Sequence, residues 1–586
     1  MRKFYPLSFI LSPFISFLFI LSAYNSVSAQ NIFDFGDWVS YRDTRSVRSI
    51  DGGGQEIFFA TSGGILSYQL LRNFWYEPMA VGYGMTEAVD LGDPVLLYLD
   101  TETGLLWVAN RTELLQFNLR QERWKRVEQY LWPQSERLVN FGAGGDHVYL
   151  ETIPEYDYER WVEDYKPLPY PAWEKKVTRY VGDRDYGSFF KDINPVDTVN
   201  VRWRGLRSLQ ALVTAQLGHI AIAHPPAGFP AVELPHGWIW QFDGNLIDPR
   251  LRTFPIMDWY LDGYSRFWTA QWGAGIMKVN LLDTRGELIM QGPAGNDIRT
   301  ILVTADAIWM GGANNGEALG FSRADRSYKS WSYIENRDSQ RIRTTELNEI
   351  AEWQGLLWFA TADGLLSYDK KNKWGLYAVQ DNLYHNHVTA LEPVGDELYI
   401  GTEDGLCVMN KEIFQIDRIP QDGLETFGVT DIVACGDSIY VGSPVGLFVA
   451  AQGSRSFVFG SIDQSLTVGE VSDISAYENE HWLVTAHGVM KYDHLRRKSV
   501  SWLADVWMKG AEPVCVHAME DYVWVGTKDD GFYRYKKGSN EWLNYNTTDG
   551  LLSNHVQTIE HDGDDLLVGT EKGLTRFYWN RPNRNK

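Results

Sequence analysis

Short hydrophobic runs alternate with polar turns along most of the chain. Within residues 523–574, each run lasts four to six residues and ends near a glycine, aspartate or asparagine. Runs of this length, closed by such turns, predict antiparallel β-strands. One period contains four runs before the pattern starts again, and four-stranded units repeated many times predict the blades of a β-propeller.

The spacing of the repeat supports this interpretation. In the second half of the chain a small residue follows the second run of each unit, at Thr361, Thr402, Ser443, Thr485, Thr527 and Thr570. The steps of 41, 41, 42, 42 and 43 residues match the ~40–45 residues of a four-stranded blade. The first half is less regular, with equivalent positions at Thr61, Asn110, Thr152, Ala223, Gln271 and Gly312. We therefore expect twelve units, six in each half, and an open solenoid is the competing architecture.

Because propellers hold about four to eight blades, this number of units predicts an all-β chain with two β-propellers of about six to seven four-stranded blades each. We expect an N-terminal propeller at residues 30–335, with an insertion at about 153–210, and a C-terminal propeller at residues 336–586. Residues 38–41 have the form of an outermost strand without inner strands, whereas residues 566–579 supply inner strands without an outer one. The two ends are therefore predicted to complete one blade, which removes a free sheet edge. Tandem and inserted layouts both remain open.

The repeat resembles the two-component regulator propeller repeat of bacterial sensor proteins. The matching residues are Trp374, Tyr377, Asn386, Val388, Gly401, Thr402, Gly405 and Leu406, and again Trp542, Tyr545, Gly550, Leu551, Asn554, Val556, Gly569, Thr570, Gly573 and Leu574. The resemblance covers residues 355–586 well and 37–335 in degraded form. It implies an exported double β-propeller that stands alone, without the kinase half of the family's sensors. Because the matched residues belong to the framework of the blades, the resemblance implies no particular ligand.

The N-terminus predicts export from the cytoplasm. Arg2 and Lys3 precede a strongly apolar stretch at residues 4–23, and a small-x-small cleavage motif ends at Ala29. This order is that of a secretory signal peptide, residues 1–29, cleaved near Ala29; an uncleaved anchor is the alternative. No later stretch reaches the ~18 apolar residues that a membrane span needs. We therefore expect a periplasmic or extracellular protein with no membrane span after cleavage.

Composition narrows the choice of partners and cofactors. The formal charge of −22 disfavours nucleic acid and anionic lipid as partners. The 24 tryptophans and 31 tyrosines suit blades that pack on aromatic side chains. Cys407, Cys435 and Cys515 fall in three different units, so buried free thiols are favoured over a disulfide. No motif has the ligand spacing of a metal site, and we expect no metal and no cofactor.

Polar residues gather in two kinds of loop that share one face of a propeller. These loops follow the second strand of a blade or lead into the next blade, and propellers commonly bind ligands there. The candidate ligand-binding residues are His385, Asn386, Glu403, Asp404, Lys528, Asp529, Asp530, Asn554, His555 and Glu571. The alternative is structural, because Asn386 and Asn554 recur at one place in the repeat, where they would satisfy turn backbone groups.

The predicted insertion is dense in tyrosine, tryptophan, arginine and aspartate. Such residues anchor interfaces, and the candidates are Tyr156, Tyr158, Trp161, Tyr186 and Trp203. A spacer packed against one propeller is the alternative. The sequence contains no serine-hydrolase elbow, no His-Glu-x-x-His and no phosphate loop, so no catalytic residue is assigned and we expect no enzyme.

Three classes of function are compatible with these observations. The favoured class is an exported recognition or sensor module that binds a glycan, a peptide or an envelope protein. The second is a scaffold in envelope assembly or type IX-like secretion. The third, a polysaccharide-active enzyme, requires only two suitably spaced carboxylates, and the chain has 76 acidic residues.

Overall fold

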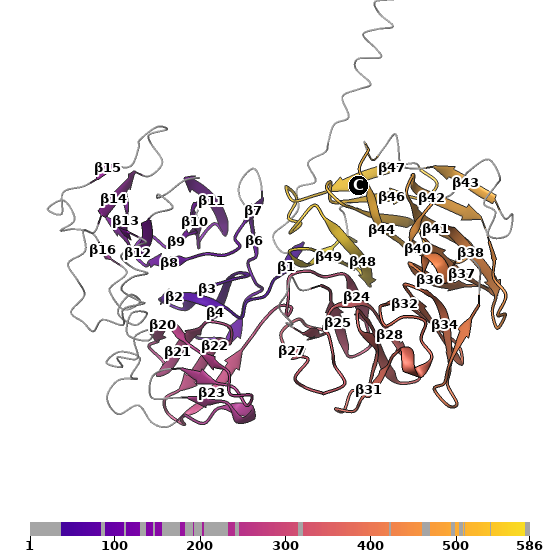
Figure 1. Cartoon of the computed structure of the whole chain (residues 1–586). Coiled ribbons are helices and arrows are strands. Elements are labelled where there is room, and N and C mark those ends of the chain that lie inside the picture. Colours follow the sequence, from indigo (N-terminus) through magenta and orange to yellow (C-terminus); the bar gives the residue numbers. More distant parts are fainter. Residues whose placement is uncertain are drawn as a thin grey trace, which may run out of the picture. The chain divides into compact units, whose positions relative to one another are not determined.

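The hydrophobic runs of the sequence form β-strands in the computed structural model of the chain (Figure 1). The structure describes residues 37–580 except 84–87, 111–112, 129–135, 145–146, 155–175, 182–190, 193–201, 204–231, 241–244, 314–319, 421–423, 460–468, 494–497, 503–507, 509 and 540. Helical elements among these residues are single turns, namely η2 (Pro235–Gly237), η3 (Val379–Asp381) and α4 (Leu424–Phe427). None of these described helices has the length and hydropathy of a membrane span. The prediction of an all-β chain is confirmed, whereas the predicted signal peptide lies outside the described residues.

The second half of the chain forms four-stranded antiparallel blades. Within the described residues seven such sheets occur, each given from its inner to its outer strand. They are β24 (Thr300–Val303), β25 (Ala307–Gly311), β26 (Phe321–Asp325) and β27 (Trp331–Ile334); β28 (Leu347–Trp353), β29 (Leu356–Thr361), β30 (Gly364–Tyr368) and β31 (Trp374–Tyr377); β32 (Val388–Val394), β33 (Glu397–Thr402), β34 (Gly405–Asn410) and β35 (Ile416–Ile419); β36 (Asp431–Cys435), β37 (Ser438–Ser443), β38 (Gly446–Ala451) and β39 (Val458–Phe459); β40 (Val471–Tyr477), β41 (Glu480–Thr485), β42 (Gly488–Asp493) and β43 (Lys498–Trp502); β44 (Pro513–Ala518), β45 (Tyr522–Thr527), β46 (Phe532–Lys536) and β47 (Glu541–Tyr545); and β48 (Val556–Asp562), β49 (Asp565–Thr570), β50 (Gly573–Tyr578) and β1 (Trp38–Tyr41).

The inner strands of these blades form a closed ring. Each inner strand contacts the next, in the order β24, β28, β32, β36, β40, β44 and β48, and β48 contacts β24 again. The blades therefore surround a common centre, as the labels of Figure 1 show. We call this ring the C-terminal propeller, and its closure excludes the open solenoid.

The first strand of the described chain closes this ring. β1 pairs with β50, so that Trp38 lies opposite Phe577 and Tyr41 opposite Leu574. The Trp38 ring stacks on Phe577, with 4.0 Å between ring centroids. The predicted closure by the two ends of the chain is confirmed. The layout is the inserted one, because the strands from β2 to β23 lie in sequence between β1 and β24.

The remaining sheets make up the N-terminal propeller. They are β2 (Val47–Gly53), β3 (Glu56–Thr61), β4 (Gly64–Gln69) and β5 (Phe74–Trp75); β8 (Leu96–Asp100), β9 (Leu105–Ala109), β10 (Leu114–Asn118) and β11 (Arg123–Glu128); β12 (Glu136–Gly144), β13 (His147–Pro154), β14 (Lys176–Val181) and β15 (Lys191–Asp192), with β16 (Arg202–Trp203) on the other edge of β12; β17 (Ile239–Trp240), β18 (Leu246–Ile247) and β19 (Thr253–Phe254); and β20 (Ile256–Leu261), β21 (Arg266–Gln271), β22 (Gly275–Asn280) and β23 (Arg285–Ile289). A separate hairpin joins β6 (Val81–Tyr83) to β7 (Ala88–Asp90). Inner strand β2 contacts both β20 and β8, and β8 contacts β12.

The predicted boundary between the propellers at residue 335 is wrong. The blade from β24 to β27 precedes that boundary, yet its inner strand contacts β28 and β48 of the C-terminal propeller. The boundary therefore falls between β23 and β24, and seven of the twelve expected units belong to one ring. The sequence could not assign this blade, because Gly312 stands where the regular units have threonine or serine. The unit expected at Ala223 lies outside the described residues.

The predicted insertion at about 153–210 also needs correction. Strand β14 pairs with β13, with Lys176 opposite Thr152 and Val181 opposite His147. Lys176–Val181 is thus the third strand of a blade rather than part of an insertion. The repeat spacing failed here because residues 155–175, outside the described part of the chain, lengthen the connection between two paired strands.

A hydroxyl group explains why threonine recurs after the second strand of each blade. The Thr402 hydroxyl donates to the carbonyl of Gly405 at 2.8 Å. Gly405 has a φ of 142°, which residues with a side chain rarely adopt. The equivalent bond to the glycine three residues on is made by Thr61, Thr361, Ser443, Thr485 and Thr570, whereas Thr527 bonds to Gly531, four residues on. The Gly-Thr-x-x-Gly pattern therefore encodes a tight turn that joins the second and third strands.

Large aromatic residues fill the space between blades. The third residue of the second strand is fully buried in several blades, at Trp358, Tyr399, Tyr440, Trp482 and Trp524. The three cysteines are free thiols, buried at Cys407 and Cys515 and half-buried at Cys435. The expectation of buried free thiols is therefore confirmed for Cys407 and Cys515, and burial raises the pKa of all three thiols.

Candidate functional site

Most of the predicted ligand residues lie at one end of the inner strands of the C-terminal propeller. There the turn after a second strand meets the loop before the inner strand of the same blade. The Glu403 amide donates to the His387 carbonyl at 3.2 Å, and the Lys528 amide donates to the Glu512 carbonyl at 3.0 Å. We call this end the rim and define it by the side chains of His385, His387, Glu403, Asp404, Glu512, Lys528, Asp529, Asp530, His555 and Glu571.

Two blades place a histidine beside a glutamate on the rim. His387 Nδ1 lies 2.6 Å from Glu403 Oε1, and His385 Nδ1 lies 3.5 Å from Glu403 Oε2. At the equivalent position of the last blade, His555 Nδ1 lies 3.6 Å from Glu571 Oε2. The two glutamate side chains are about half exposed, at 52% and 48%. A partner molecule can therefore contact these pairs without any rearrangement of the blades.

The other charged rim residues are also exposed. Lys528 forms an ion pair with Glu512 at 3.2 Å, and Asp404 and Asp529 are exposed at the tips of their turns. Asp530 accepts a hydrogen bond from the Tyr533 hydroxyl, and this contact raises the pKa of Tyr533, on which burial has the largest effect. The rim thus presents both signs of charge with an excess of carboxylates.

Asn386 and Asn554 serve the fold in the way that the structural alternative expects. The Asn386 side-chain oxygen accepts from the Val379 amide at 3.0 Å, and the Asn554 oxygen accepts from the Thr547 amide at 3.0 Å. Their carbonyls accept from the glycine amides of the neighbouring turns. Both asparagines therefore stabilise the loops that display the rim residues.

Half-buried carboxylates link neighbouring blades further along the inner strands. Glu349 accepts from the Leu391 amide at 2.6 Å, and Glu392 accepts from the Ala434 amide at 2.8 Å. Asp431 accepts from the Ile474 amide at 2.7 Å, and Asp473 accepts from the Val516 amide at 2.6 Å. Each carboxylate satisfies a backbone donor on the unpaired edge of the next blade's inner strand, where a missing acceptor would be costly.

Burial sets the protonation of this set of carboxylates. It raises the pKa of Glu392 to about 7 and that of Asp431 to about 6. Burial together with the nearby charge of Asp431 raises the pKa of Glu349 and Asp473 well above the usual range. The side chains keep part of their surface exposed, as expected near the centre of a ring. Sequence reasoning missed this role, although Glu349, Asp431 and Asp473 each stand 12 residues before the threonine or serine that ends the second strand.

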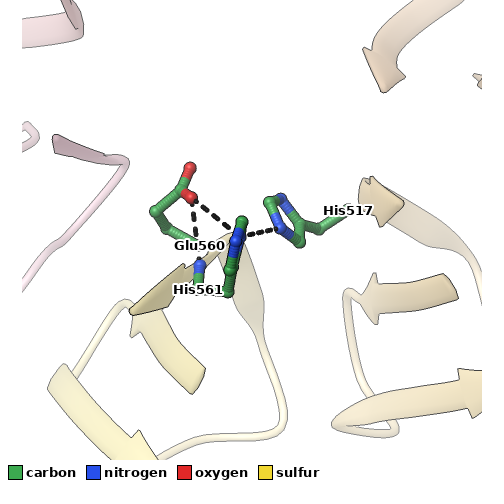
Figure 2. A group of neighbouring side chains, drawn as sticks. All are labelled: His517, Glu560 and His561. Atoms are coloured by element: carbon green, nitrogen blue, oxygen red, sulfur yellow. Dashed lines mark hydrogen bonds and ion pairs between the residues drawn. The ribbon is translucent and has the colours of Figure 1, made fainter. Parts of the chain in front are cut away.

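A third group of polar side chains occupies the opposite end of the inner strands from the rim. His517 belongs to β44, and Glu560 and His561 belong to the neighbouring inner strand β48. Figure 2 shows His561 between the other two side chains. The distance from His517 Nε2 to His561 Nδ1 is 2.8 Å, and His561 Nδ1 lies 3.4 Å from Glu560 Oε1. We call these three residues the His–Glu–His cluster.

The three side chains of the cluster shift one another's pKa values. The Glu560 carboxylate accepts a hydrogen bond from the His561 ring and raises the pKa of His561, whereas burial and the charge of His561 lower the pKa of His517. Burial opposes ionisation of Glu560, but its contacts with His561 and the charge of His517 outweigh that effect and lower its pKa. Of the two histidines, His561 is therefore the one whose charged form the cluster favours.

Sequence reasoning missed the His–Glu–His cluster. His517 and His561 lie 44 residues apart, and no short motif joins them. One signal was available, because β44 and β48 carry histidine near their ends and the five other inner strands of this propeller carry none. His517 and Glu560 each stand 10 residues before the threonine that ends the second strand, and His561 follows Glu560 directly, so polar residues at one repeat position of two neighbouring blades indicate a shared site.

The predicted interface residues are mostly not described. Tyr156, Tyr158, Trp161 and Tyr186 lie outside the described residues. Trp203 is in β16, where its backbone pairs with Gly142 of β12.

The chain forms β-propellers, and comparisons with known proteins agree with this class. No protein-family model matches the chain, and no curated protein matches it. Among solved structures, the chain is similar to PorZ, a surface component of the type IX secretion system of Porphyromonas gingivalis. The identity is 11%, the TM-score is 0.54, and the match covers 93% of this chain and 87% of that chain. At this identity the likeness shows the fold alone.

Weaker likenesses extend to extracellular domains from B. thetaiotaomicron. The domain assigned to the hybrid two-component system BT4673 has 13% identity and a TM-score of 0.44, covering 92% of this chain and 70% of that chain. The domain assigned to the system BT3049 has 12% identity and a TM-score of 0.41, covering 93% and 83%. With TM-scores this low, these likenesses carry no argument about function.

Proposed function

We propose that the chain is an exported, non-enzymatic recognition protein that binds a glycan, a peptide or an envelope protein through the rim of its C-terminal propeller. One observation carries the proposal: two separate blades of the same closed ring hold exposed His–Glu pairs at equivalent repeat positions. Polar side chains on loops fixed by a rigid scaffold are typical of recognition surfaces. Export is supported by the signal-peptide pattern of residues 1–29, which suggests a periplasmic or extracellular site of action.

The experiment compares the wild-type protein with the double variant E403Q/E571Q. Both proteins are applied to a glycan array, a peptide array and a solubilised envelope fraction, and then incubated with activated glycosides. We expect the wild type to bind one of the first three without releasing a product, and the double variant to lose that binding at unchanged thermal stability. The control is E412Q, because Glu412 is exposed in a turn beyond β34, away from the rim. Equal binding by the double variant would contradict the proposal, as would hydrolysis of a glycoside.

A second candidate function is a structural role in envelope secretion. The likeness to PorZ over most of both chains favours it. This candidate expects a stable complex with envelope proteins and no binding to either array. Co-purification from the envelope, with cross-links mapped by mass spectrometry, separates the two candidates, because a scaffold should still co-purify when the rim carboxylates are replaced.

A further inference from the structure

The His–Glu–His cluster places three metal-ligand atoms at one point. His517 Nε2, His561 Nδ1 and a Glu560 carboxylate oxygen all lie within 4.8 Å of one another. Two imidazole nitrogens and one carboxylate are the ligand set of several catalytic and open zinc sites. Among the residues that the structure describes, this is the group of histidine, cysteine and acidic side chains that meets this distance.

We propose that His517, Glu560 and His561 form a binding site for one divalent transition-metal ion of the Zn²⁺ class. The proposal is independent of the rim and of the function proposed for it. It also revises the expectation from the sequence, which contained no metal motif because the ligands come from two blades.

Two of the three distances between ligand atoms are at or near the value for a tetrahedral ion. With metal–ligand bonds of about 2.0–2.1 Å, the ligand atoms of a tetrahedral site lie about 3.4 Å apart. The distance from His561 Nδ1 to Glu560 Oε1 is 3.4 Å. The distance from His517 Nε2 to His561 Nδ1 is 2.8 Å, so the two rings must separate by roughly half an ångström. His561 is exposed and His517 is half-buried, so small rotations of the side chains suffice.

The chemistry of the cluster also suits a metal. Two imidazole nitrogens 2.8 Å apart need a proton on one of them, because two facing lone pairs would repel. A shared proton meets this need in the metal-free protein. A divalent ion would replace that proton and bind all three donors, so metal binding should release protons. Carboxylate and imidazole together favour zinc-like ions over Ca²⁺, which prefers oxygen ligands alone.

The position of the cluster leaves room for a fourth ligand. The backbone of β44 and β48 holds the cluster from one side, at the end of the inner strands where His561 is exposed. Three protein ligands leave one tetrahedral position for water or for a group from a partner. Glu512 and His517 bracket β44, and a strand rising about 3.3 Å per residue places them roughly 16 Å apart. The rim and the metal site are therefore separate surfaces.

The test measures metal binding to the full-length protein directly. The purified protein is stripped with a chelator, dialysed and titrated with Zn²⁺ by calorimetry, and bound metal is counted by mass spectrometry. Co²⁺ is used in parallel, because its visible absorption reports tetrahedral coordination. We expect one equivalent of Zn²⁺, proton release on binding, and a tetrahedral Co²⁺ spectrum.

Three variants assign the ligands. H517Q, H561Q and E560Q should each weaken Zn²⁺ binding by more than about 100-fold, since loss of groups that only support ligands already costs 10–100-fold. The matched control is H387Q, which removes a histidine from the other group of two histidines and one glutamate, on the rim. Circular dichroism melts check that every variant is folded. If a ligand variant does not fold, diethyl pyrocarbonate protection of His561 by Zn²⁺ in the wild type serves instead.

Three outcomes of this test support or overturn the proposed metal site. Loss of binding in H517Q and H561Q, with retention in H387Q, supports the site. Absence of stoichiometric Zn²⁺ binding by the wild type overturns it and leaves the cluster as a shared-proton hydrogen bond between blades. Loss in H387Q with retention in H561Q also overturns it, because the metal would then bind the rim.

Discussion

The two ends of the inner strands in the C-terminal propeller both gather histidine and glutamate, but they do so in different ways. On the rim, His387 and Glu403 come from two loops of one blade, and the repeat fixes their relative position. In the His–Glu–His cluster, His517 comes from one blade and Glu560 and His561 from the next. The comparison teaches that a repeat predicts contacts within its own unit, whereas contacts between units depend on how the ring closes.

Opening the ring should disturb both ends together, and we expect it to have the largest effect. Trp38 is 4% exposed and stacks on Phe577 in the blade that carries both Glu571 and His561. The W38A variant should lower the free energy of unfolding by about 3–5 kcal/mol, the usual cost of truncating a buried aromatic residue. Guanidinium denaturation measures the free energy of unfolding of each variant. W272A is the control, because Trp272 is 41% exposed; an equal loss in both variants would show that β1 does not close the blade.

The carboxylates between the two ends should make stability depend on pH. The pKa of Glu392 is about 7 in the folded protein, against 4.5 normally. The folded state therefore binds a proton at Glu392 more tightly than the unfolded state does. The contribution of this proton to the free energy of unfolding is complete below pH 4.5 and is lost as the pH rises through 7. Relative to the wild type, E392Q should be more stable at pH 8 by up to about 3 kcal/mol.

The pH profile contains its own control. At pH 4 both proteins carry a neutral side chain at position 392, which accepts from the Ala434 amide, so their free energies of unfolding should agree. Urea unfolding at pH 4, 6 and 8 provides the measurement. A difference between wild type and E392Q that stays constant across this range would refute the assignment.

Removing a turn hydroxyl should affect the rim and spare the other end. In T402V the buried Gly405 carbonyl loses its 2.8 Å donor, and we expect a loss of about 1–2 kcal/mol in the free energy of unfolding. Zn²⁺ binding at the His–Glu–His cluster should not change. T548V is the control, because the Thr548 hydroxyl is in an exposed turn. Equal losses in both variants would mean that the Gly-Thr-x-x-Gly turn does not depend on the hydroxyl.

Removing a rim charge should have the smallest effect on stability. Glu403 is 52% exposed and paired with His387, and exposed ion pairs contribute about 0–1 kcal/mol. E403Q should therefore unfold within 1 kcal/mol of the wild type, as measured by thermal and urea denaturation. A larger loss would mean that the rim pairs hold the blade together, which would weaken the case for a recognition surface.

The sequence by itself determined the local structure of the C-terminal propeller. The hydrophobic runs predicted its strands, and the Gly-Thr-x-x-Gly pattern predicted its turns, because a hydroxyl and a glycine within four residues are enough to build such a turn. The form of residues 38–41 also predicted ring closure. The strands and turns depend on contacts within one repeat unit, and ring closure followed because residues 38–41 and 566–579 are complementary parts of one unit.

Only the tertiary structure decided which blades share a ring and which side chains meet across blades. The blade from β24 to β27 looks irregular in sequence, yet it lies between two regular blades of the C-terminal propeller. The bond from Glu349 to Leu391 and the meeting of His517 with His561 likewise join neighbouring blades. Their positions depend on the height and rotation of one strand relative to the next, and the packing of whole blades around a closed ring sets those quantities.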